Sequence, residues 1–194
     1  TSCVLIKNWE SDACTRSLQV AVNVSARQFR QADFVEQVKR SLKASGANPA
    51  RLKLELTESV LLKNVEDTIA KMLAIKRLGV AFSLDDFGTG YSSLSYLAQL
   101  PLDQLKIDQS FVRKLPGARK EETIARTIIT MGRELDMNVI AEGVESEAQR
   151  QFLEAHGCHA FQGYLFSRPL PVGRVGVFLR EAVRWPEYRL LPCY

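Results

Sequence analysis

Residues 52–86 read LKLELTESVLLKNVEDTIAKMLAIKRLGVAFSLDD, and this stretch carries the pattern on which the fold prediction rests. Leu52–Leu56 is short and apolar, as strands are, and residues 65–78 place apolar side chains at helical spacing. Gly79 is suited to end that helix, and Val80–Leu84 then predicts a second strand. A strand, a helix and a strand in this order indicate two parallel strands joined by a helical crossover.

The same alternation extends along the chain in both directions. Four more short apolar runs predict strands at Leu18–Val24, Leu105–Ile107, Asn138–Ala141 and His159–Gln162. Amphipathic stretches between and after them predict helices near residues 34–45, at Thr123–Leu135, after Ser146, and at Val172–Val183.

Local signals mark the ends of two of these helices. Asp33 with Glu36, and Ser146 with Gln149, have the spacing of capping boxes. Gly46 is placed to end the first of the two helices.

Polar residues at the strand ends favour a barrel. An open doubly wound sheet and a closed (β/α)8 TIM-like barrel both fit the α/β alternation. Nearly every strand ends in a residue that chemistry can use: Asn23, Glu55, Asp85, Asp86, Lys106, Asp108, Glu142 and Gln162. In a barrel these ends converge on one mouth, and the first strand is followed by no Gly-rich phosphate loop. We therefore expect a barrel, with about six of its eight βα units in this chain.

Composition fits one globular domain with an anionic small ligand. The chain has 194 residues and a formal net charge of +4, an excess too small to indicate binding of duplex nucleic acid. No apolar run is long enough to span a membrane, and no signal peptide opens the sequence, so we expect a cytoplasmic domain without membrane contact. The four cysteines show no CxxC spacing, and we expect free thiols.

The predicted mouth has the composition of a site for hard divalent cations. Glu55, Asp85, Asp86 and Glu142 supply carboxylates, and Asn23 supplies a carbonyl oxygen. Oxygen ligands suit Mg²⁺ or Mn²⁺, and adjacent aspartates can hold two ions.

Lys106 completes this predicted constellation. Two metal ions can activate a water for phosphoryl displacement, and a lysine beside them can orient that water or offset charge in the transition state. The two histidines, His156 and His159, lie outside these strand ends, which argues against a zinc site built from histidines.

Six segments resemble the EAL-domain phosphodiesterases, in the same order: NVSARQF (23–29), ELTES (55–59), DDFGTGYSSLSYL (85–97), LKIDQSFV (105–112), AEGVES (141–146) and QGYLFSRPL (162–170). The resemblance covers about residues 14–180. It implies a modified TIM barrel that hydrolyses cyclic di-GMP to linear pGpG with Mg²⁺ or Mn²⁺, whereas Ca²⁺ supports binding and inhibits turnover.

The resemblance also implies roles for individual residues. Asn23, Glu55 and Asp85 are expected to hold one metal ion, and Asp85, Asp86 and Glu142 the second. Lys106 is the expected catalytic lysine. The remaining expected site residues support the site, position water or bind substrate: Glu58, Asp108, Glu145, Gln162 and Arg168.

The loop after Asp86 is the expected link to dimerisation. Gly88 and Gly90 permit backbone conformations closed to other residues, so the loop can change shape. In the family this loop lies near a dimer contact, and we expect a homodimer with Phe87 and Tyr91 as candidate contacts.

The sequence departs from the family pattern at its start. The Glu-Ala-Leu segment that names the family, and the arginine that follows it, do not occur among the 194 residues. We therefore expect residues 1–194 to be a single EAL-type domain missing its first strands. Its opening residues are expected to lie in the helix after the missing strand, and turnover by this chain alone is expected to be very slow.

Two alternatives remain open at this point. The chain could be an inactive module that binds cyclic di-GMP, or a dimerisation fragment that binds no nucleotide. Individual roles are open as well: Glu145 and Gln162 could be purely structural, Asp108 could simply pair with Lys106, and Arg168 could form a surface salt bridge.

Overall fold

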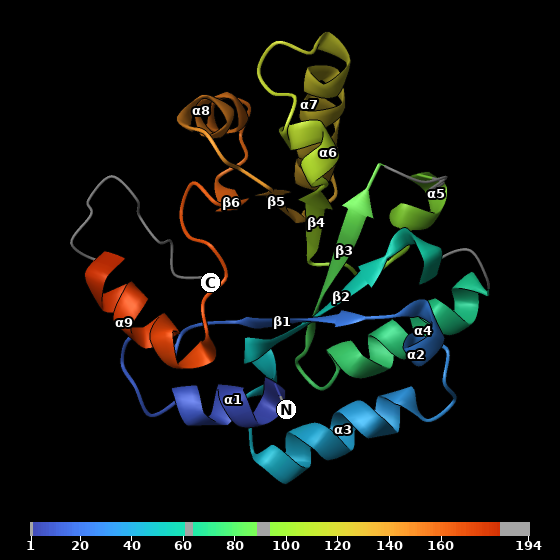
Figure 1. Ribbon diagram of the computed structural model, residues 1–194. Coiled ribbons are helices and arrows are strands. Elements are labelled where there is room, and N and C mark those ends of the chain that lie inside the picture. Colours follow the sequence, from blue (N-terminus) through green and yellow to red (C-terminus); the bar gives the residue numbers. More distant parts are fainter. Residues whose placement is uncertain (1, 61–63, 89–93, 183–194) are drawn as a thin grey trace.

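Six parallel strands form a curled sheet in the computed structural model, which describes residues 2–60, 64–88 and 94–182 (Figure 1). The strands are β1 (Val20–Val24), β2 (Leu52–Thr57), β3 (Ala81–Phe87), β4 (Gln104–Ile107), β5 (Asn138–Glu142) and β6 (Ala160–Gln162). Each strand pairs with the next one in the sequence, in the order β1-β2-β3-β4-β5-β6. A doubly wound sheet reverses its strand order partway, so this order confirms the barrel-type prediction, with six strands of the barrel present.

Helices connect the strands and cover the outer face of the sheet (Figure 1). The α-helices are α1 (Ser2–Trp9), α2 (Ala26–Phe29), α3 (Phe34–Ser45), α4 (Val65–Lys76), α5 (Leu94–Leu97), α6 (Gln109–Val112), α7 (Arg119–Glu134), α8 (Glu147–Ala155) and α9 (Val172–Ala182). Two 3₁₀ turns add η1 (Pro49–Arg51) and η2 (Glu58–Val60). The sequence predicted the long helices; it did not indicate α2, α5, α6 or the 3₁₀ turns. No helix within the described ranges has the length and apolar character that crossing a membrane requires.

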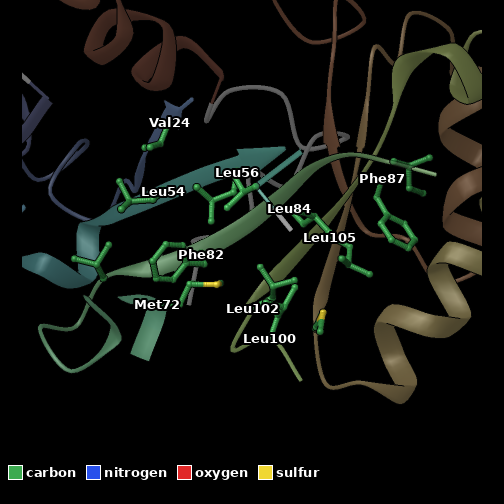
Figure 2. Packing of buried hydrophobic residues seen from close by; sticks show 14 of the residues in the cluster. Val24, Leu54, Leu56, Met72, Phe82, Leu84, Phe87, Leu100, Leu102 and Leu105 are labelled. Carbon is green, nitrogen blue, oxygen red and sulfur yellow. The ribbon is translucent and has the colours of Figure 1, made fainter. Parts of the chain in front are cut away.

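The core lies between the outer face of the sheet and the helices. Along β2, Leu52, Leu54 and Leu56 are buried and alternate with partly exposed polar residues. Because side chains alternate across a strand, the leucines face the helices and the polar residues face the concave side. Figure 2 shows Leu54 and Leu56 near Phe82, with Met72 of α4 beside them. The concave face is therefore left for polar side chains.

Of the two predicted capping boxes, one is confirmed and one is wrong. Ser146 Oγ accepts a hydrogen bond from the backbone N–H of Gln149, and Gln149 Oε1 accepts one from the backbone N–H of Ser146. Asp33 is at the expected position, but its φ of −95° and ψ of 9° differ from the extended backbone of a capping residue. Its carboxylate instead accepts a hydrogen bond from the Gln37 side chain. Gly46 ends this helix with a φ of 66°, as expected.

Helix α9 returns to the chain segment after α1. Arg180 lies 3.3 Å from Asp12 in an exposed ion pair, and Gly176 packs near Asp12 and Thr15. The last described helix thus contacts the segment that follows the first helix.

Cysteines Cys3, Cys14 and Cys158 are free thiols, as expected. Cys158 has only 1% of its surface exposed, and burial raises the pKa of its thiol to about 11. We expect iodoacetamide at pH 8 to alkylate Cys158 at least about 100-fold more slowly than the partly exposed Cys14, since the thiolate is the reactive form. Peptide mass spectrometry measures both rates, and urea should abolish the difference. Equal rates in the folded protein would contradict this packing.

Candidate active site

Lys106 is the point at which four strand ends meet. Its Nζ lies 3.0 Å from Glu55 Oε2 of β2 and 3.1 Å from Asp85 Oδ1 of β3, and it also contacts Glu142 Oε1 of β5. Lys106 itself belongs to β4 and is only 4% exposed. The parallel strands thus bring residues 87 positions apart in the sequence onto one ammonium group, as the barrel prediction requires.

A β-bulge places both aspartates opposite Lys106. Leu84 pairs with Leu105 and Phe87 pairs with Ile107, so β3 has one residue more than β4 between these pairs. The extra residue gives Asp86 a φ of 54°, in the left-handed region that few residues other than glycine adopt. Bulges of this kind often occur beside active sites, where they redirect side chains.

Negative charge exceeds positive charge in the cluster that Lys106 forms with Glu55, Asp85 and Glu142. Burial raises the pKa of Asp86, and the carboxylates of Asp85 and Asp108 raise it further. Burial also raises the pKa of Glu142; contact with Lys106 opposes this shift, while Asp85 and Glu55 add to it.

Lys106 responds in the opposite sense. Burial disfavours its charged form, but hydrogen bonds and attraction from Glu142 and Glu55 outweigh burial and raise the pKa of Lys106 above its ordinary value. The lysine is therefore a permanent cation, and it leaves the carboxylates around it only partly neutralised.

The donor set fits divalent cations by its chemistry. The clustered groups offer carboxylate oxygens of the kind that Mg²⁺ and Mn²⁺ prefer, and their excess negative charge favours further cations. Among residues 2–60, 64–88 and 94–182, however, no group of three His, Cys, Asp or Glu side chains is arranged so that it could hold one metal ion. Glu55, Asp85 and Glu142 surround the Lys106 ammonium instead, so they would have to turn toward a bound ion.

Asn23 and Gln162 lie at the two sides of this cluster. Asn23 of β1 is the register partner of Glu55, and Gln162 of β6 is the register partner of Glu142. Both residues are exposed. Polar residues therefore occupy the strand ends as far as β1 and β6, the two outer strands of the sheet.

Glu58 lies behind the bulge and holds the start of the following loop. Its Oε1 accepts a hydrogen bond of 2.8 Å from the backbone N–H of Gly88, which has a φ of 94°. Its Oε2 is buried and has no hydrogen-bond partner among the described residues. The supporting role expected for Glu58 stays a prediction.

Three other predicted residues, Asp108, Glu145 and Arg168, are not among the residues that form ion pairs with Lys106. The Asp108 carboxylate accepts a hydrogen bond from Ser110 N–H and caps α6, whereas the ion pairs of Lys106 are with Glu55, Asp85 and Glu142. Glu145 is exposed. Arg168 lies over the exposed ring of Tyr164, with its guanidinium carbon 4.9 Å from the ring centre.

The prediction that Phe87 contacts a second copy of the chain is wrong. Phe87 is only 6% exposed and belongs to the hydrophobic core (Figure 2). The bulge explains this, because one extra residue turns Phe87 to the face of Leu84 instead of that of Asp85. Tyr91 and Gly90 lie outside the described residues.

Sequence reasoning missed a polar layer below the cluster. Lys53 donates a hydrogen bond of 3.1 Å to Gln104 Oε1, and Ser83 Oγ lies 3.2 Å from the same oxygen. The signal was present, because Lys53 is two residues before Glu55 and Gln104 is two residues before Lys106. Alternation along a strand places such pairs on one face.

Comparisons with known proteins agree with this geometry. The model of the EAL domain family matches residues 1–169. Cyclic di-GMP phosphodiesterase NbdA of Pseudomonas aeruginosa is 46% identical over 163 residues, which cover 84% of this chain and 21% of that protein. The chain spans 20–26% of the length of this and two further curated relatives.

Two solved structures share the fold. The PaMucR phosphodiesterase in complex with c-di-GMP superposes with a TM-score of 0.84 at 38% identity, over 89% of this chain and 70% of that one. Klebsiella pneumoniae BlrP1 in complex with manganese and c-di-GMP at pH 6 gives a TM-score of 0.76 at 29% identity, over 87% of this chain and 42% of that chain. With the family model matching most of its length and the strand-end residues gathered as the fold requires, this chain belongs to the EAL domain family.

Proposed function

We propose that this chain carries the catalytic centre of a cytoplasmic phosphodiesterase that hydrolyses cyclic di-GMP to linear pGpG with Mg²⁺ or Mn²⁺. The observation that carries the proposal is the convergence of Glu55, Asp85 and Glu142 on Lys106 from four strands. Relatives named as cyclic di-GMP phosphodiesterases, and the PaMucR complex with c-di-GMP, support the choice of substrate.

The carboxylates and Asn23 would hold the metal ions. Asn23, Glu55 and Asp85 are assigned to one ion, and Asp85, Asp86 and Glu142 to the other. Bound ions of this kind lower the pKa of a water and stabilise the phosphoryl oxygens. Asp85, which belongs to both sets, sits in the bulge beside Lys106.

Lys106 supplies the positive charge that the reaction needs from the protein. Water adds to phosphorus and the bond from phosphorus to O3′ breaks, which leaves a 5′-phosphate and a free 3′-hydroxyl. Charge develops on the phosphoryl oxygens during this step, and a buried ammonium can donate hydrogen bonds to them or to the attacking water. Because it is held by several strands, Lys106 is oriented before substrate arrives.

The other predicted residues would support this centre. Gln162 and Glu145 are assigned to positioning water, and Asp108 to fixing the segment after Lys106. Arg168 is assigned to a substrate phosphate or guanine face, as its present stacking on Tyr164 indicates an affinity for rings. Glu58 keeps the loop after the aspartates in place.

A single-turnover assay tests the proposal. Protein in excess is mixed with cyclic di-GMP and Mn²⁺, and the products are separated by chromatography. We expect pGpG with Mn²⁺ or Mg²⁺, and none with EDTA or Ca²⁺, although calorimetry with Ca²⁺ should show binding. Binding without pGpG under every metal would indicate a binding module, and no binding at all would indicate a dimerisation fragment; either result contradicts the enzyme.

A further inference from the structure

The polar layer below the active site joins β2 to β4 across β3. Lys53 on β2 donates to Gln104 Oε1 on β4, at 3.1 Å. β2 and β4 do not pair with each other, because β3 lies between them. Ser83 of β3 is fully buried and is 3.2 Å from the same oxygen, so its hydroxyl and the Lys53 ammonium both donate to it. Two donors on one oxygen fix the carboxamide of Gln104.

This layer repeats the layer above it. Glu55 and Lys106 form a second contact from β2 to β4, at 3.0 Å, two residues further along each strand. In the lower contact the ammonium comes from β2, and in the upper contact it comes from β4. Side chains two residues apart on a strand point to the same face, so the two contacts lie one above the other on the concave side.

The lower contact therefore bears on the geometry of the upper one. The bulge in β3 removes regular pairing between Leu84 and Phe87, beside the upper contact. Regular pairing resumes below the bulge, where Ser83 is the register partner of both Glu55 and Gln104. The lower contact thus fixes the separation of β2 and β4, and this separation in turn determines the distance between Glu55 and Lys106.

We propose that Lys53 and Gln104 are positioning residues, which set the separation between Glu55 and Lys106 without touching substrate. This inference rests on the proposed phosphodiesterase function. It assigns a role to two residues that lie below the strand ends, one layer from the reacting atoms. Small displacements of catalytic groups can lower a rate by as much as about 100-fold, so the effect is measurable.

The test compares Lys53→Met, Gln104→Leu and the double variant in the single-turnover assay with Mn²⁺. We expect each single substitution to slow hydrolysis about tenfold, and the double variant to be little slower than Gln104→Leu, because both substitutions remove the contact between Lys53 and Gln104. Affinity for cyclic di-GMP in Ca²⁺ should stay within about twofold, and Lys53→Arg should restore most of the rate because it keeps the donor.

Lys76→Met is the matched control. Lys76 forms an ion pair of 2.7 Å with Asp103, just before β4 begins, at the opposite end of the strands. We expect this variant to lower the melting temperature by an amount similar to Lys53→Met while leaving the hydrolysis rate unchanged. A rate unchanged in Lys53→Met, or lowered equally in Lys76→Met, would overturn the positioning role.

A crystal structure of Lys53→Met separates this inference from the proposed function. We expect the Lys106 Nζ to Glu55 Oε2 distance to exceed hydrogen-bond length in the variant. If the unsubstituted protein forms no pGpG, the phosphodiesterase proposal fails, and this distance alone decides the positioning role. An unchanged distance would overturn the inference, whether or not the protein is active.

Discussion

Lys106→Met is expected to slow hydrolysis of cyclic di-GMP by at least about 100-fold, the usual loss when a donor to the transition state is removed. Methionine keeps the length of the side chain and removes the ammonium that contacts Glu55, Asp85 and Glu142. The single-turnover rate with Mn²⁺ measures the effect. A rate within tenfold of the unsubstituted protein would contradict the catalytic role of Lys106.

The same substitution should also weaken the fold. Three carboxylates would then face one another without a cation between them, at a site where the Lys106 side chain is only 5% exposed. Loss of one partner from a buried ionic cluster costs about 3–5 kcal/mol. Lys106→Arg keeps the charge and isolates the catalytic loss if Lys106→Met fails to fold. Lys114→Met, in the exposed pair with Glu121, is the control and should change neither property.

Gly163→Ala is expected to lower the free energy of unfolding by about 3 kcal/mol or more, as overpacking against rigid neighbours does. A Cβ at Gly163, directly after β6, would overlap the backbone N and O atoms of Val144. Those atoms form 3.0 Å hydrogen bonds with Gln162 O and Leu165 N, so backbone pairing beside Glu142 would be lost. Urea denaturation measures the change.

Gly173→Ala provides the matched control for that substitution. A Cβ at Gly173 in α9 would have no atom within 4 Å among the described residues. Alanine favours helix over glycine by up to about 1 kcal/mol, so the control should be neutral or slightly stabilising. Equal denaturation midpoints for the two variants would show that β6 does not pack on Val144 as described.

The strands and their polar ends were predictable because both follow from local patterns. Apolar runs such as Leu52–Leu56 identify strands, and in a singly wound parallel sheet their ends must converge. Asn23, Glu55 and Glu142 could therefore be grouped before any coordinates were known, and register now places Asn23 beside Glu55. What the sequence could not show was which group forms the centre, since one of the three contacts of Lys106, that with Glu55, reaches across β3 to a strand that does not pair with β4.

The errors come from single backbone conformations. The bulge at Asp85–Asp86 adds one residue to β3, which reverses the facing of Phe87 and buries a residue expected at the surface. Asp33 has the right position for a cap, but its backbone is not extended. Residue type indicates neither the extra residue in β3 nor the dihedral angles of Asp33. The end of α3 was predictable from residue type, because the φ of 66° at Gly46 suits glycine.

The central claim is that the strand ends form a metal-dependent phosphodiesterase site, and the rate of pGpG formation against Mn²⁺ concentration tests it most directly. The unsubstituted protein and Asp85→Asn, which alters the carboxylate assigned to both ions, are compared in one titration. We predict a rate that rises and saturates with Mn²⁺ for the unsubstituted protein, and one at least about 100-fold lower for Asp85→Asn. Equal rates for the two proteins, or no pGpG from the unsubstituted protein at any Mn²⁺ concentration, would contradict the account.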